Sequence, residues 1–467
     1  MSLLLVGLDN TIVNVALPSI GRELHTTVSG LQWTVDAYTL VLASLLMLAG
    51  SMGDRLGRKR VFSLGLVLFT LGSLLCSVAP SLGTLIAFRM LQAIGGSMLN
   101  PVAMSIIRNV FTDARERAQA IGVWGATVGL SLALGPVVGG ALVESVGWRS
   151  IFWINIPVGV AALALTLRFV PESRAPHARR LDALGQGLVI ALFGSLTYAI
   201  IEAPTAGWLS AQSLALFAIA LAALAVLLPY ESRRREPLLE LRFFRSVPFS
   251  SASVIAICAF AALGGFLFLN TLYLQEVRGL SALKAGLCTL PIAVMTLVFA
   301  PISGRLVGSR GPRIGLLVGG GGIALGSALL TGLGAHTSIP SLVPAYLIFG
   351  IGFGMVNPPI TNTAVLGMPP AQAGVAAAVA STSRQLGQTL GVAVVGAIAA
   401  GGAVSVGAGF VAASHTGWWL VSGCGAAVFA LGLASTTARA QTSARKVADE
   451  LDDQDGEPAR DGELVGV

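Results

Sequence analysis

Asp9, Asp36 and Arg89 carry ionisable side chains inside long apolar stretches of this 467-residue chain. A charge inside hydrocarbon costs about 3 kcal/mol on insertion scales, so each of the three needs a reason to be there. Asp9 falls near the middle of the first stretch, Asp36 about five residues into the second, and Arg89 about seven residues into the fourth. A carboxyl group that moves between apolar and polar surroundings can take up and release a proton.

We expect Asp9 or Asp36 to couple proton uptake to the movement of a substrate. A protonated carboxyl group leaves the site neutral, whereas the ionised form attracts a cation. Arg89 stays charged and must find an anion, backbone carbonyls or water. Structural alternatives remain open: a packing hydrogen bond for Asp9, an interfacial position for Asp36 and a static ion pair for Arg89. Glu202, beside Pro204 at the end of another stretch, is expected at the membrane interface.

The composition identifies the elements that must position these groups. The chain is 54% hydrophobic and only 11% charged, whereas a soluble domain usually has about 25% charged residues. This excludes a cytosolic enzyme, a disordered chain and a disulfide scaffold. The apolar stretches are continuous and about twenty residues long, as helices that cross about 30 Å of hydrocarbon require. Membrane β-barrels instead alternate over about ten residues, so the sequence predicts an all-α polytopic membrane protein.

Fourteen apolar stretches are predicted as transmembrane helices. Their approximate limits are 1–20, 31–52, 60–79, 83–107, 117–143, 150–170, 184–203, 210–230, 248–274, 282–304, 314–334, 341–366, 372–399 and 416–436. With loops on alternating sides, 23 of the 29 Lys and Arg residues fall on one side, four on the other and two inside stretches. Basic residues accumulate in cytoplasmic loops, so both termini are predicted to be cytoplasmic. Residues 438–467 are predicted to form a disordered cytoplasmic tail.

A charged loop joins the second and third stretches at residues 50–60 (GSMGDRLGRKR). Its basic side chains face the cytoplasm, and Asp54 can pair with a base or with a helix N-terminus. Its glycines permit tight turns and close contacts. We expect a loop that gates the cytoplasmic side, and the alternative is a basic anchor without a gating role. The gating residues would be Gly50, Asp54, Arg55, Gly57 and Arg58.

A second motif, in the fifth stretch, combines a helix-breaking proline with small residues that let helices approach closely. Its members are Gly135, Pro136, Gly139 and Gly140. Further polar or aromatic residues are candidates for the wall of a central cavity. They are Trp33, Tyr38, Gln92, Asn357, Asn362 and Arg384. For the aromatic residues among them, ordinary packing remains the alternative, and for Arg384 anchoring to lipid or a loop.

These motifs, in this order, resemble the major facilitator superfamily, and in particular its fourteen-helix branch of drug:proton antiporters. Three other segments add to the likeness: residues 8–18 (LDNTIVNVALP), residues 89–92 (RMLQ) before Gly95 and Gly96, and residues 148–157, which end in Asn155, Ile156 and Pro157. The resemblance runs from about residue 3 to about residue 437. Ala93 stands where the family usually has glycine. Residues 304–313 echo residues 50–59, with Gly308 at the acidic position.

The resemblance implies two six-helix bundles, residues 1–170 and 248–437, related by a pseudo-two-fold axis along the membrane normal. Two inserted linker helices would occupy residues 184–230. It further implies that Arg89 modulates protonation of a nearby acid, and that the motif around Gly135 marks an antiporter and so favours export. Duplicated halves around a midplane site are typical of transporters.

The sequence therefore predicts a proton-driven efflux antiporter of the bacterial cytoplasmic membrane. It would export amphipathic drugs or dyes, cationic ones among them, by alternating access. One alternative is an exporter of an endogenous metabolite or antibiotic, and another is a non-transporting sensor on the same fold. The expected partners are the substrate, protons and the lipid bilayer, with no nucleic acid, no cofactor, no metal and a monomeric state. The chain has no nucleotide-binding loop of the GxxxxGK[ST] type, and no enzyme activity is expected.

Overall fold

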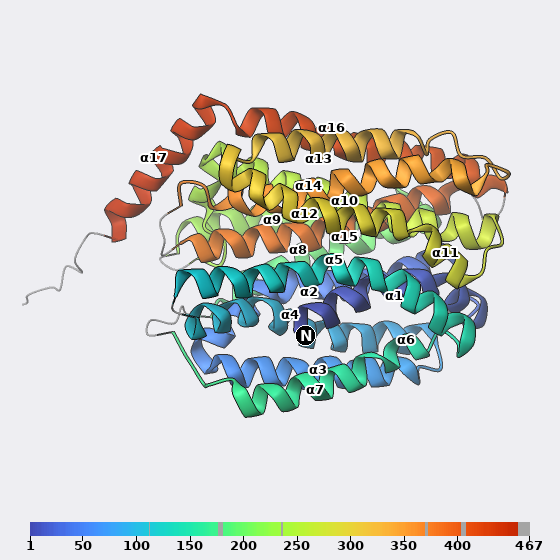
Figure 1. The fold of residues 1–467 in the computed structure, drawn as a ribbon, viewed down its shortest axis with the longest axis horizontal. Coiled ribbons are helices and arrows are strands. Elements are labelled where there is room, and N and C mark those ends of the chain that lie inside the picture. The colour runs from blue at the N-terminus through green and yellow to red at the C-terminus, as the bar shows by residue number, and fades with distance from the viewer. Residues whose placement is uncertain (112, 176–180, 235–236, 369–371, 403–407, 456–467) are drawn as a thin grey trace, which may run out of the picture.

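The computed structural model describes the chain except for residues 112, 176–180, 235–236, 369–371, 403–407 and 456–467. The described residues form helices, turns and loops, without a β-strand. Most helices run along one common axis and form two lobes (Figure 1). Helices are the expected outcome, because the backbone groups of an apolar segment in hydrocarbon must satisfy their hydrogen bonds within that segment.

The N-terminal lobe contains seven helices. They are α1 (Ser2–Glu23), α2 (Val28–Leu56), α3 (Arg58–Ser77), α4 (Leu82–Val110), α5 (Ala114–Ser145), α6 (Ser150–Trp153) and α7 (Asn155–Phe169). Helix α4 packs against α2 and α3, α3 also packs against α7, and α1 packs against α5. A helical break at Ile154 separates α6 from α7.

The C-terminal lobe begins with a short 3₁₀ helix. Its elements are η1 (Leu241–Arg245), α10 (Val247–Leu272), the π-helix η2 (Tyr273–Val277), α11 (Ala282–Cys288), α12 (Leu290–Arg310), α13 (Arg313–Ala328), η3 (Ile339–Leu342), α14 (Val343–Val365), α15 (Ala373–Gly402) and α16 (Ala408–Ser435). Helix α13 packs closely on α14 and α16. A Cβ atom at Gly320 of α13 would lie only 2.4 Å from the backbone nitrogen of Phe429 in α16. Small residues therefore set the spacing of these helices.

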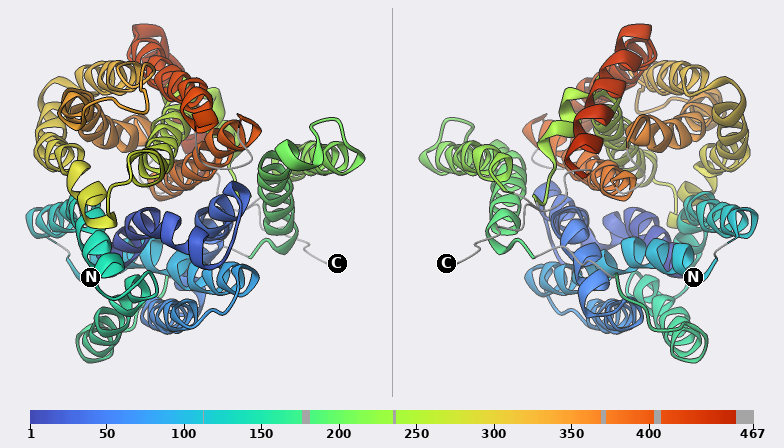
Figure 2. Two further views of the ribbon diagram at one scale, coloured as in Figure 1. Left: turned by 90° about the vertical axis from the view of Figure 1, so that its right-hand side faces the viewer. Right: turned by 90° about the vertical axis from the view of Figure 1, so that its left-hand side faces the viewer.

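Helices α8 (Ala183–Ala206) and α9 (Ala211–Ser232) stand beside the two lobes rather than inside either one (Figure 2). Helix α8 contacts α2 of the N-terminal lobe and α15 of the C-terminal lobe, and α9 packs on α8. The pair therefore covers one side of the surface at which the lobes meet. We call that surface the seam; it is formed by α1, α2 and α5 against α10, α11, α12 and α15.

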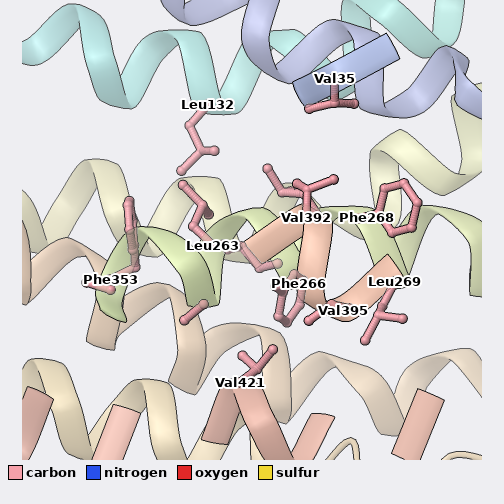
Figure 3. Close-up of a cluster of buried hydrophobic side chains, with 14 of the residues drawn as sticks. Val35, Leu132, Leu263, Phe266, Phe268, Leu269, Phe353, Val392, Val395 and Val421 are labelled. Carbon is pink, nitrogen blue, oxygen red and sulfur yellow. The ribbon is translucent and has the colours of Figure 1, made fainter. Parts of the chain in front are cut away.

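One hydrophobic cluster extends across the seam. Figure 3 shows Val35 and Leu132 of the N-terminal lobe facing side chains of α10 and α15, among them Leu263 and Val392. All four residues are buried. The lobes are thus held together in this conformation largely by apolar contact, which can be broken and remade without the loss of directional bonds.

Eleven helical segments among the described residues are long and apolar enough to cross a membrane. Two shorter apolar segments, Gly129–Ser145 and Arg313–Ala328, belong to α5 and α13. The multi-pass helical architecture predicted from the sequence is therefore present. The count of fourteen spans and the cytoplasmic position of both termini remain predictions.

The predicted disorder of the C-terminal tail is wrong for its first part, because Ala438–Asp455 form helix α17. Its apolar residues recur at helical spacing, and Ala440, Ala444, Val447 and Leu451 are buried. This face packs against η1 and α10. The prediction of disorder used the number of charged residues in the tail. The helical spacing of its apolar residues, which favours an amphipathic helix, does not enter such a count. The remaining tail, residues 456–467, lies outside the described residues.

Candidate functional site

Asp9 lies at the centre of a buried polar cluster formed by α1, α4 and α7. Arg89 Nη1 donates a hydrogen bond to Asp9 Oδ2 at 2.5 Å. Gln92 Nε2 and Asn155 Nδ2 donate to Asp9 Oδ1 at 2.8 and 2.9 Å. All four side chains are completely buried. The negative charge of Asp9 is therefore compensated by one cation and two amide donors, as a buried charge requires.

Arg89 is held by several neighbours besides Asp9, although its Nη2 is buried without a hydrogen-bond partner. Its Nη1 also donates to Gln92 Oε1 at 2.8 Å, one helical turn away on α4. Its Nε donates to the backbone carbonyl of Thr34 at 3.3 Å. The guanidinium carbon lies 4.2 Å from the ring centroid of Tyr38, a cation–π distance. Helix α2 thus contributes a carbonyl and an aromatic face to the site.

Asn155 and Ser73 are cluster residues that the candidate list from the sequence does not contain. Asn155 Nδ2 lies 3.0 Å from Ser73 Oγ, which in turn donates to the carbonyl of Phe152. The sequence holds a signal for Asn155, an amide just after the Trp148 and Arg149 motif in an otherwise apolar span. Ser73 carries no such signal, because single hydroxyls are common in membrane helices.

Asp36 lies on a different face of α2 and is not part of the Asp9 cluster. Gln32, Asp36 and Thr39 share one helical face, which looks onto α15. Gln32 Nε2 donates to the carbonyl of Ala393 at 2.8 Å, and Thr389 Oγ1 lies 2.9 Å from Thr39 Oγ1. Asp36 is fully buried between these contacts, and neither of its carboxyl oxygens has a hydrogen-bond partner. An ionised Asp36 would be an uncompensated charge at the seam.

The charged loop after α2 is organised within the N-terminal lobe. Asp54 Oδ1 accepts hydrogen bonds from Arg58 Nε and Nη2 at 3.1 and 2.9 Å. The backbone of Arg58 donates to the carbonyl of Ser173 at 2.9 Å, and Ala175 donates to the carbonyl of Asp54 at 3.1 Å. The loop therefore binds the segment that follows α7. Gly57 takes a left-handed φ of 116° to make the turn.

The other predicted loop residues have simpler surroundings. Arg55 is exposed, and a Cβ atom at Gly50 would lie 3.6 Å from Pro101 of α4. Glu172, in the segment after α7, accepts a hydrogen bond from the backbone of Lys59 at 3.1 Å and lies 3.6 Å from Arg60. The gating role of this loop stays a prediction.

The glycine motif of α5 lies between α1 and the C-terminal lobe. Cβ atoms at Gly135 and Gly139 would collide with Thr11 and Ile12 of α1. A Cβ atom at Gly140 would lie 2.6 Å from the carbonyl oxygen of Ala282 in α11. The motif is therefore used for close packing on both sides.

The partner helix makes an equally close approach. A Cβ atom at Gly286 of α11 would lie 2.1 Å from the carbonyl oxygen of Pro136. Two polar contacts fasten the same end of the seam: the Arg22–Glu276 ion pair at 3.4 Å, and a hydrogen bond at 3.3 Å from the backbone of Leu283 to Glu144. This end lies opposite the loop that contains Asp54, because consecutive helices alternate in direction.

The predicted cavity-wall residues do not form one group. Tyr38 and Gln92 belong to the Asp9 cluster, as described above. Trp33 faces α8 instead, where its Nε1 donates to Glu202 at 3.0 Å and its ring lies 5.4 Å from Tyr198. In this conformation the Trp33 side chain serves the contact between α2 and the inserted helices, and its cavity-wall position stays a prediction.

The three remaining wall candidates lie in the C-terminal lobe. Asn357 is half-buried and Asn362 is exposed, both on α14. Arg384 of α15 donates to the hydroxyl of Thr361 on α14 and to Ser381 Oγ. Within the part of the chain that the structure describes, no three or more His, Cys, Asp or Glu residues gather as a metal site would require.

Comparisons with known proteins agree with this architecture. The Major Facilitator Superfamily profile matches residues 1–392. The chain is 37% identical to the multidrug resistance protein Stp of Mycobacterium tuberculosis over 400 residues, 86% of this chain and 74% of that protein. It is 36% identical to the tetracenomycin C resistance and export protein of Streptomyces glaucescens over 405 residues, 86% and 74% of the two chains.

A solved structure supports the fold independently. A bacterial homologue of the human lysosomal transporter Spinster, in an inward-facing and unoccupied conformation, aligns with a TM-score of 0.65. The alignment covers 96% of each chain at 17% sequence identity. From the profile match and the relatives above 30% identity, this chain belongs to the major facilitator superfamily of membrane transporters.

Proposed function

We propose that this protein is a proton-coupled antiporter that exports amphipathic small molecules across the bacterial cytoplasmic membrane by alternating access. The named relatives that confer drug resistance support export as the direction of transport. In this proposal the proton gradient supplies the energy, no cofactor takes part, and the protein works as a monomer.

The observation that carries the proposal is the contrast between two buried carboxyl groups. Asp9 has a cation and two amide donors, whereas Asp36 has neither, and only the Thr39 hydroxyl acts on its carboxyl group. At the Asp36 position, burial of a neutral carboxyl group costs far less free energy than burial of a carboxylate without a cation or amide donor. Separation of the lobes would bring Asp36 into contact with water, where the ionised form is stable. Asp36 is thus the group whose proton occupancy changes with the conformation, and Asp9 is the compensated acid.

We further propose a fourteen-helix arrangement with the Asp54 loop in the cytoplasm. The eleven long segments supply most of the crossings, and α5, α13 and α15 would supply the remainder. The connections that contain Arg58, Arg234 and Arg310 share one end of the bundle, and basic residues accumulate on the cytoplasmic side. The end of the seam fastened by Gly140 and Gly286 would then face outward.

This orientation assigns the conformation to a state closed on the outside. The close contacts between α5 and α11 support the outer closure. The Asp54 loop is bonded to residues of its own lobe, which supports a cytoplasmic side that is not locked. In the opposite state the same loop would bind the C-terminal lobe while the α5–α11 contact opens.

The proposal is tested with the full chain reconstituted into liposomes that enclose a pH-sensitive dye. Addition of a transported amphiphile under an imposed pH gradient should cause proton movement and gradient-dependent accumulation. Asp36→Asn should abolish proton movement while the protein still binds the amphiphile. Thr39→Val, which changes the neighbouring seam contact without an ionisable group, is the matched control. Accumulation of the amphiphile to the same level with and without the pH gradient would contradict proton coupling.

A second candidate is an exporter dedicated to one antibiotic made by the same cell. The relative named for tetracenomycin C resistance and export favours it. Competition among a panel of unrelated amphiphiles separates the two functions. A dedicated exporter would be inhibited by one chemical scaffold only, and a multidrug exporter by several.

A further inference from the structure

Arg384 carries a positive charge for which the C-terminal lobe supplies no acid. Between Glu276 and Asp449 the sequence contains no Asp or Glu. Glu276 itself is at the opposite end of the seam and paired with Arg22. Among the described residues, no carboxylate forms an ion pair with Arg384. An arginine inside an apolar helix stays charged and needs an anion, backbone carbonyls or water, and this lobe provides no anion for Arg384.

Arg384 lies one helical turn from a residue of α15 that contacts the N-terminal lobe. Gln388, one turn further along α15, accepts a hydrogen bond at 3.0 Å from Nδ2 of Asn10 in α1. Asn10 directly follows Asp9. Residues four apart share a helix face and lie about 6 Å apart along the axis. Arg384 is therefore on the seam face of α15, one turn from the level of the Asp9 cluster.

The surroundings of the guanidinium group are neutral and incompletely bonded. Its Nη1 lies 3.4 Å from Ser381 Oγ, and its Nη2 donates to the hydroxyl of Thr361, an exposed residue. Its Nε has no hydrogen-bond partner. The ring of Phe260 lies 6.0 Å from the guanidinium carbon. This leaves a buried donor without a partner, close to an exposed hydroxyl and an apolar ring, a combination that suits an acidic group attached to an aromatic or aliphatic body.

The charges across the seam do not change this preference. Asp9 and Arg89 neutralise one another, and Asp36 accepts no hydrogen bond from Arg384. A cationic substrate near α15 would meet a like charge, whereas a carboxylate would meet an unmatched guanidinium group. Electrostatic complementarity of this kind decides between partners more than it sets total affinity.

We propose that Arg384 binds the carboxylate of an amphipathic substrate through its free guanidinium edge, while Phe260 packs against the substrate's apolar part. The proposal rests on the export function proposed above and specifies its substrate class: acidic or zwitterionic amphiphiles rather than purely cationic ones. It narrows the substrate class predicted from the sequence, which was amphipathic drugs or dyes with cationic ones among them.

The test uses tetramethylrhodamine, which has a free carboxylate, and its ethyl ester, which does not. Binding of each dye to the detergent-purified full chain is measured by fluorescence polarisation. The wild type should prefer the free acid. Arg384→Gln should lower affinity for the free acid about tenfold or more, the usual size of a charge-assisted hydrogen bond, and leave affinity for the ester within about twofold. Arg384→Lys, which keeps the charge, should restore part of the loss.

Arg313→Gln is the matched control, because it removes an equal charge from an exposed residue at the start of α13. It should bind both dyes as the wild type does. Equal affinity of the wild type for both dyes, a preference for the ester, or an unchanged preference in Arg384→Gln would overturn the proposal.

Binding needs no gradient, so this result is separate from the test of export. The same two dyes in liposomes with an imposed pH gradient report transport. Arg384-dependent binding of the free acid without gradient-driven accumulation would overturn proton-coupled export and leave the carboxylate site standing. Gradient-driven accumulation of both dyes without Arg384-dependent binding would overturn the carboxylate site and leave proton-coupled export standing.

Discussion

The connection between α2 and α3 and that between α12 and α13 have the same backbone design but different charges. Each first helix ends at a glycine with left-handed φ, 116° at Gly57 and 79° at Gly311. Each of these glycines donates its N–H to the carbonyl four residues earlier, at Gly53 and Val307. The backbone thus repeats where the sequence echo between residues 50–59 and 304–313 predicts it.

The side chains of the two connections differ at the acidic position. Asp54 accepts two hydrogen bonds from Arg58, whereas a Cβ atom at the equivalent Gly308 would meet nothing within 4 Å. Glycines that set turns have been retained on both sides, and an acid has been retained on one. The glycine turn of such a connection can therefore form without the Asp–Arg hydrogen bonds that accompany it after α2.

The same division holds for the two lobes as a whole. The N-terminal lobe contains the buried ion pair of Asp9 and Arg89 and the unpartnered Asp36. Close glycine contacts occur in both lobes, at Gly95 of α4 as at Gly320 of α13, but in the C-terminal lobe no described carboxylate forms an ion pair with Arg384. In the function proposed above, the N-terminal lobe would carry the proton and Arg384 of the C-terminal lobe would contact the substrate.

The largest expected effect comes from the buried ion pair. Asp9→Asn leaves Arg89 as an uncompensated buried charge, which costs about 3–5 kcal/mol of stability. Both the melting temperature of the purified protein and gradient-driven transport should fall strongly. The double variant Asp9→Asn with Arg89→Met should recover much of the stability but none of the transport. If the single variant melts like the wild type, the ion pair is not the central interaction of this lobe.

The next effect concerns the outer end of the seam. Gly286→Ala places a methyl group 2.1 Å from the carbonyl oxygen of Pro136 and should destabilise this conformation by about 1–3 kcal/mol. Gly304→Ala in α12 is the matched control, because nothing lies within 4 Å of that position. It should be neutral or up to about 1 kcal/mol more stable. The melting temperature and the transport rate of Gly286→Ala and Gly304→Ala are compared. Equal values for the two variants would show that the α5–α11 contact is not required for stability or transport.

The sequence predicts well how deep a residue lies along its membrane helix, but it predicts poorly which way the residue faces around the helix axis. Hydropathy defines where a residue lies along a helix, and so Asp9 and Arg89 were expected within reach of each other. Rotation about the helix axis depends on neighbouring helices. For this reason the contact of Trp33 with Glu202 of α8 was not expected, and the seam-facing position of Asp36 could not be derived.

Fold and family were accessible because they depend on properties that repeat along the chain. Continuous apolar stretches predicted the helical architecture, and ordered motifs predicted the family, which the profile match confirms. Helix α17 was missed because a short amphipathic helix needs a surface to pack on, and that surface, η1 and α10, exists only in the folded chain.

A moderate effect should distinguish the two glycine-ended connections. Asp54→Asn weakens the bonds to Arg58 on a partly exposed surface and should cost about 0.5–1 kcal/mol, with a measurable loss of transport. The reciprocal variant Gly308→Asp should leave melting and transport near wild type, because no partner is arranged for the new acid. A loss of transport as large in Gly308→Asp would mean that the second connection also takes part in gating.

The smallest effect is expected where an ion pair is fully accessible to solvent. Arg245 and Glu450 join η1 to α17 at 3.3 Å, with side chains 69% and 51% exposed. Water and salt screen such a pair, so Arg245→Gln should change stability by less than about 0.5 kcal/mol. Val447→Asp, which puts a charge into the buried face of α17, should instead release the helix and make it sensitive to limited proteolysis. If Arg245→Gln released α17 as readily, charge rather than apolar packing would hold this helix, and the C-terminal lobe would depend on an ion pair after all.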